Sequence, residues 1–147
     1  MNKELIKDNF EKLPAPKNGF RISPIEQEHY GIEIAEFLAC ANGLTDFLFK
    51  HGDFGTAMIF NCAITDTLNN LGNIKKKKYR TSMFFMNAAI AAINMRNFTA
   101  TLDFINAAKV DIKEKGSGTL NLKKLDNLER DALALQKEAQ TPAAYIG

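Results

Sequence analysis

Residues 83–95 read MFFMNAAIAAINM and form the most apolar stretch of this 147-residue chain. A helix over these residues would carry apolar side chains on every face, so we expect other helices to surround it. We predict that this helix covers about 74–95 and that close contacts between helix backbones form at its alanines. Those alanines are Ala88, Ala89, Ala91 and Ala92.

Helical spacing and capping residues predict four more long helices around this stretch, over about 24–50, 54–71, 98–115 and 120–139. Ser23 and Pro24 mark a typical helix start. The first of these helices has a seam that we expect to face inward, made of Tyr30, Ile34, Phe37, Ala41, Leu44 and Leu48. No convincing period-two stretch occurs, so we predict an all-α fold of five helices in stacked antiparallel hairpins, with a short N-terminal helix over 3–13.

A chain of this length is typical of one domain. We expect a single helical domain over 1–147, which begins with an N-terminal segment over 1–22. A first hairpin over 23–72 and a second over 73–116 would follow, and a C-terminal capping helix over 119–140 would close the fold.

Composition excludes several classes of protein. The net charge of +2 argues against a strongly basic nucleic-acid coat and against an acidic mimic of nucleic acid. No apolar run approaches the roughly 20 residues that span a bilayer, and the N-terminus lacks the apolar core of a signal peptide, so we expect a cytoplasmic protein that does not contact membranes. The 15 lysines against 4 arginines indicate an AT-rich coding sequence, which with the small size favours a phage or mobile-element origin.

A weak internal repeat relates the two hairpins at an offset of 44 residues. Phe54 aligns with Phe98, Met58 with Leu102, Phe60 with Phe104 and Ala63 with Ala107. Each unit resembles a tetratricopeptide-repeat hairpin, and the resemblance covers about 36–112. It implies stacked hairpins whose first helices line a concave face that binds partners. The period is longer than in that family, and the usual proline after the second helix is missing, so a generic helical bundle is the alternative.

The implied concave face would carry Met83, Met86 and Ile90, together with Asn42 and Asp46 from the first helix. Methionine side chains repack easily and suit the binding of variable partners. We therefore predict a non-enzymatic intracellular protein-interaction module that uses these five residues to bind a protein partner, and to regulate or inhibit it.

A basic run predicts the second function. Lys75, Lys76, Lys77, Lys78 and Arg80 would lie in the first turns of the helix over 74–95, where cations repel one another and oppose the helix dipole. An anionic partner would compensate, whether nucleic-acid phosphate or an acidic protein patch. The alternative is therefore a nucleic-acid-contacting accessory protein, and the simplest explanation is a solvated helix start.

The residues that bear chemistry do not form a recognisable catalytic set. Glu33 and Glu36 lie one helical turn apart, as in all-α metal-dependent nucleotide hydrolases, but such enzymes need a second acidic pair on a facing helix. An all-α metal-dependent nucleotide hydrolase is therefore the least favoured alternative, and we predict no enzyme activity, cofactor or metal. Cys40 and Cys62 are expected to be buried, reduced thiols.

We also predict a homodimer. The helix over 74–95 has more apolar surface than five helices obviously cover, and the helix over 24–50 carries a sustained apolar seam. Burying such surfaces between two copies is common, since two-fold dimers are the most frequent oligomers.

Overall fold

The computed structural model describes residues 23–140, which contain six helices and no strand. The helices are α2 (Pro24–Tyr30), α3 (Ile32–Lys50), α4 (Phe54–Lys75), α5 (Ser82–Asn94), α6 (Phe98–Lys115) and α7 (Leu122–Gln140). The all-α prediction is confirmed for this range. The predicted number of five helices is wrong for this range, which contains six. The predicted helix over 3–13 lies outside the described residues.

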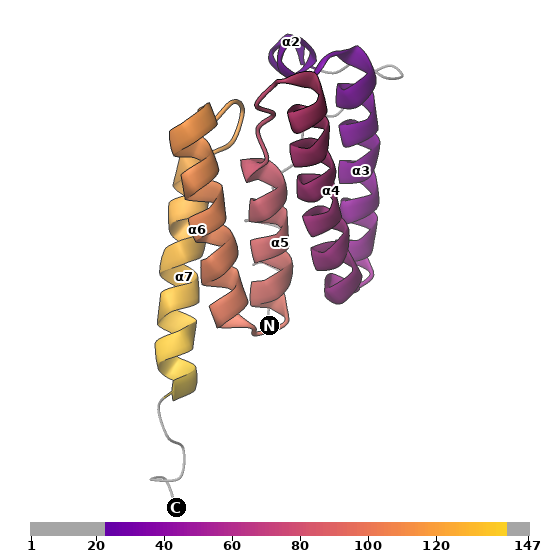
Figure 1. Ribbon diagram of the computed structural model, residues 1–147. Helices are drawn as coiled ribbons and strands as arrows, with labels where there is room; N and C mark the ends of the chain where they lie inside the picture. The colour runs from indigo at the N-terminus through magenta and orange to yellow at the C-terminus, as the bar shows by residue number, and fades with distance from the viewer. Residues whose placement is uncertain (1–22, 141–147) are drawn as a thin grey trace, which may run out of the picture.

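The helix predicted over 24–50 is divided at Gly31. This glycine has φ +87° and ψ 153°, a backbone conformation that residues with a Cβ rarely adopt. Its N–H donates to the Gln27 carbonyl at 2.8 Å and its carbonyl accepts from the Ala35 N–H at 2.9 Å, so the break costs neither hydrogen bond. As a result α2 turns away from α3 and crosses the end of the helix row (Figure 1).

Helices α3 to α6 form a row in which consecutive helices run antiparallel and pack against each other (Figure 1). The last helix, α7, packs along α6 and also contacts α5. This arrangement places α5 in the middle of the row, between α4 and α6.

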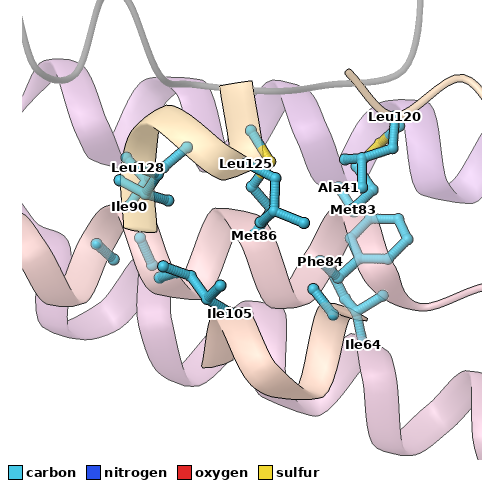
Figure 2. Packing of buried hydrophobic residues seen from close by; sticks show 14 of the residues in the cluster. Ala41, Ile64, Met83, Phe84, Met86, Ile90, Ile105, Leu120, Leu125 and Leu128 are labelled. Carbon is cyan, nitrogen blue, oxygen red and sulfur yellow. The ribbon is translucent and has the colours of Figure 1, made fainter. Parts of the chain in front are cut away.

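The prediction that other helices surround the apolar stretch is confirmed by the burial of α5. Every residue from Met86 to Asn94 is buried, and Ala88, Ala89, Ala91 and Ala92 are inaccessible. Leu125 and Leu128 of α7 lie over Met86 and Ile90 of α5 (Figure 2). The C-terminal helix therefore covers part of α5, and its role as a cap of the fold stays a prediction.

A buried polar cluster joins α3, α4 and α5. The Asn87 side-chain amide donates to Asn42 Oδ1 at 3.1 Å and to Asn61 Oδ1 at 3.2 Å. Asn61 in turn donates to Thr45 Oγ1 at 3.0 Å. Because a buried amide without partners costs about 1–3 kcal/mol, this cluster favours one register of the three helices over others.

Two predicted helix ends are wrong, and both flank the connection between α4 and α5. Gly72 does not stop α4, which continues to Lys75. The connecting chain instead folds back over Gly72: a Cβ there would lie 2.5 Å from the Lys77 carbonyl oxygen. In consequence α5 begins at Ser82 and not near 74, whereas α6 has the predicted bounds.

Candidate functional site

The residues predicted to line a concave face lie mostly inside the protein. Asn42, Met83, Met86 and Ile90 are all buried, since α5 is enclosed by its neighbours. Asp46 is half-buried and forms an ion pair with Lys50 at 2.9 Å on the same helix. These five residues therefore form no groove on the surface of the described chain.

The lysine run lies at a helix C-terminus, which reverses the predicted electrostatics. Lys75 is the last residue of α4, and Lys76 caps the helix in a left-handed conformation with φ 57°. The Lys77 N–H donates to the Gly72 carbonyl at 2.9 Å. A helix C-terminus attracts cations, so the helix dipole stabilises this run where the sequence predicted repulsion.

The five basic side chains of the run have different surroundings. Arg80 is largely buried, with Nη2 3.5 Å from Glu26 Oε1. Lys78 forms an ion pair with Glu114 at 3.3 Å, and Lys77 Nζ donates to the His29 carbonyl at 3.4 Å. Lys75 and Lys76 are exposed and have no acidic partner among residues 23–140. The run is therefore not a continuous anion-binding strip.

Next to this run lies an open groove of about 600 Å³ between α4 and α6. Its apolar lining includes Leu68 of α4, Phe85 of α5 and Val110 of α6. Lys77 and Lys78 line it from the α4–α5 connection, and Lys115 lines it from α6. Glu114 and Asp111 also line the groove and pair with Lys78 and Lys115, so the groove combines apolar surface with a basic edge on which Lys77 has no acidic partner within residues 23–140.

The shape of this groove depends on Asp111, a residue that the sequence did not single out. Asp111 Oδ2 accepts from the backbone N–H groups of Thr81 and Ser82 at 2.9 and 3.0 Å, and Oδ1 accepts from Thr81 Oγ1 at 2.8 Å. A side chain of α6 therefore caps the start of α5, as a carboxylate at a helix N-terminus should. Lys115 balances its charge at 2.8 Å.

A second polar network joins α2 to the α4–α5 connection. The His29 Nε2 atom accepts from the Arg80 N–H at 2.8 Å, and the Tyr30 hydroxyl donates to the Arg80 carbonyl at 2.7 Å. Burial and then the charge of Arg80 lower the pKa of His29 to about 4. Burial also raises the pKa of Tyr30. These two hydrogen bonds tie α2 to the α4–α5 connection, whose Lys77, Lys78 and Tyr79 line the groove.

An exposed apolar stripe on α3 was missed by the sequence analysis. Phe37, Leu44 and Phe47 are 55%, 45% and 55% exposed, and Cys40 between them is also exposed. The predicted inward seam placed Phe37 and Leu44 in the core, but α3 packs with a neighbouring face. The signal was present as apolar residues at spacings of three and four on a second face of the helix.

The remaining expectations concern metals, thiols and membranes. Among residues 23–140 no group of three or more His, Cys, Asp and Glu side chains is placed to hold a metal ion. Cys40 and Cys62 are both free, but Cys40 is exposed, which corrects the prediction that both are buried. Burial and the nearby Asp66 raise the pKa of the half-buried Cys62 thiol. No helix in the described range has the length and apolar character needed to cross a bilayer.

No protein-family model matches this chain, and neither a curated protein nor a solved structure is significantly similar to it. The tetratricopeptide-repeat resemblance therefore stays a prediction.

Proposed function

We propose that this chain is a non-enzymatic, cytoplasmic protein-interaction module that regulates or inhibits a protein partner by binding one of its acidic segments. The observation that carries this proposal is the groove between α4 and α6, which places exposed apolar surface beside Lys77, a lysine without an acidic partner among residues 23–140. The two free thiols of the described chain are consistent with a reducing compartment.

The chemistry of the groove specifies the segment that it would bind. Val110 is 65% exposed on one wall, and Phe85 lies at the floor. An apolar side chain of the partner would remove this surface from water. Acidic residues beside it would face Lys77 at the edge and, beyond the edge, Lys75 and Lys76 at the end of α4, so the expected ligand is a short acidic peptide with a central apolar residue.

Selection from a displayed random peptide library against the full chain tests this proposal. We expect selected peptides to be acidic with one large apolar residue, and their affinity to fall as salt rises, because salt screens the lysines. Val110→Glu should abolish binding by placing a like charge on the groove wall. The matched control is Ile59→Glu, since Ile59 is similarly exposed on α4 but does not line the groove. Equal binding by both variants would contradict the proposal.

Nucleic acid is the second candidate, favoured by the exposed Lys75 and Lys76. A variant in which Lys75, Lys76, Lys77 and Lys78 are all changed to Gln distinguishes nucleic-acid binding from peptide binding. Duplex DNA is the probe. Each lysine that contacts a phosphate adds about 0.9 to the slope of log affinity against log salt. Strong DNA binding that the four changes remove, with Val110→Glu unimpaired, would replace our proposal with this candidate.

A further inference from the structure

The exposed stripe on α3 has the regular spacing of a helix–helix interface, and no other helix of the described chain covers it. Phe37, Cys40, Leu44 and Phe47 recur at alternating spacings of three and four, as apolar residues do along the seam of a coiled coil. The stripe is about 15 Å long from Phe37 to Phe47, at 1.5 Å per helical residue. Three large apolar side chains in one row are unusual on the surface of a monomer.

We propose that a second copy of this chain covers the stripe, with the two α3 helices antiparallel about a two-fold axis near Asn42. In that register Phe37 faces Phe47 of the second copy, and Cys40 faces its Leu44. The stripe is therefore complementary to itself, as a two-fold interface requires. Gly43 beside the axis has no heavy atom within 4 Å of an added Cβ, so it leaves room for close approach.

The charges along α3 support an antiparallel partner. Glu33 and Glu36 flank the beginning of the stripe, whereas Lys50 and His51 flank its end. Antiparallel pairing brings the acidic end of one helix to the basic end of the other, and parallel pairing would bring like charges together. Lys50 also pairs with Asp46 of its own helix, but an ammonium has three donors and can bind both carboxylates.

A small hollow beside Phe37 would accept the side chain that this register places there. It has a volume of about 190 Å³ and is lined mainly by apolar residues of α3 and α4, including Ile34, Leu68 and Leu71. In the proposed dimer, Phe47 of the second copy lies over this hollow. Filling it adds buried apolar surface at both ends of the interface, since the two-fold axis repeats the contact.

The oligomeric mass of the full chain tests the proposal. By light scattering at micromolar concentration, we expect twice the chain mass of 16.4 kDa. Leu44→Glu should reduce the mass to that of one chain with unchanged circular dichroism, because Leu44 makes part of the interface but not of the core. Ile59→Glu is the matched control and should remain a dimer. A monomeric wild type, or a dimer that survives Leu44→Glu, overturns the proposal.

Reversing charges tests the antiparallel orientation. Glu36→Lys alone should weaken the dimer, since Glu36 lies opposite position 48 of the second copy, two residues from its Lys50, and adding Lys50→Glu should restore it. No rescue by the double change would overturn the antiparallel register.

Thiol labelling of the full chain identifies a competing occupant. In the dimer Cys40 should be protected, and in the Leu44→Glu variant it should react quickly. If the wild type is a monomer with a protected Cys40, the chain's own segment over 1–22 covers the stripe and the proposal is wrong. The surface differs from the peptide groove, so Val110→Glu should leave the dimer intact, and either proposal can fail alone.

Discussion

His29 illustrates how one side chain couples the fold to pH. Its Nε2 atom accepts the Arg80 N–H, which requires that this nitrogen carry no proton. Burial, followed by the positive charges of Arg80 and Lys77, lowers the pKa of His29 from 6.5 to about 4. Between these two pH values the unfolded chain therefore binds a proton that the folded chain excludes.

The first prediction follows from this difference in proton binding. The free energy of unfolding should fall as the pH is lowered from about 6.5 to about 4, since the unfolded state binds more protons there. His29→Gln should flatten this dependence, measured by urea unfolding across the pH range. The wild-type chain is the reference, and equal slopes for the variant and the wild type would show that His29 does not contribute.

Among the helices, α4 and α5 show how a short connection sets where elements end. The chain after Lys75 returns over Gly72, whose carbonyl accepts the Lys77 N–H. The N–H groups at the start of α5 then bind Asp111 of α6. The connection thus links three helices, and it carries the basic edge of the groove.

The second prediction concerns this close approach. Gly72→Ala should lower the free energy of unfolding by about 1–3 kcal/mol, since the new Cβ meets the backbone of Lys77 and that backbone has to move. Gly55→Ala on the same helix meets only Met95 Sδ at 3.9 Å, so it should be neutral or stabilise by up to about 1 kcal/mol. Chemical denaturation measures both, and equal effects would mean that the connection tolerates the methyl group.

Across the whole molecule, three segments distant in sequence meet at one buried carboxylate. Glu26 of α2 is 2% exposed, accepts from Thr119 Oγ1 at 2.9 Å and lies in ion-pair contact with Arg80. The Arg80 Nη2 atom lies 3.5 Å from Glu26 Oε1. It is buried and has no hydrogen-bond partner. This contact ties α2 and the α6–α7 turn to the α4–α5 connection, part of which lines the groove.

The third prediction measures that contact by a double-mutant cycle. Arg80→Met should destabilise the protein by up to about 3–5 kcal/mol, because it leaves a buried carboxylate without a cation. Combined with Glu26→Gln, the loss should be smaller than the sum of the two single losses, with a coupling of about 0.5–3 kcal/mol. The more exposed pair Lys109 and Glu129 is the control, and its coupling should not exceed about 1 kcal/mol. Additive losses for Arg80 and Glu26 would contradict the contact.

The two proposed surfaces lie on different elements, which has a consequence for the assembled protein. The stripe lies on α3 at one edge of the helix row, and the groove lies between α4 and α6 (Figure 1). A dimer through α3 would leave both grooves open. The assembly would then present two sites for acidic segments.

Local signals in the sequence were sufficient for the fold class and for several helix ends. The all-α class and the bounds of α6 follow from helical spacing and from caps such as Asn97, whose Oδ1 accepts the Ala100 N–H at 3.1 Å. The burial of 88–92 follows from a stretch that is apolar on all faces. These features depend on residues within one or two helical turns of each other, so they can be predicted from a single sequence.

Tertiary packing alone decided which face of α3 is buried and where the lysine run lies. A helix with apolar residues on two faces can pack with either, and neighbours such as Asn61 and Asn87, which bind its inner face through Thr45 and Asn42, select one. The run lies after α4, and not at the start of α5, because the Lys77 backbone packs on Gly72 and Asp111 caps Ser82. These contacts join residues that are 5 to 45 positions apart, and helical periodicity carries no information about them.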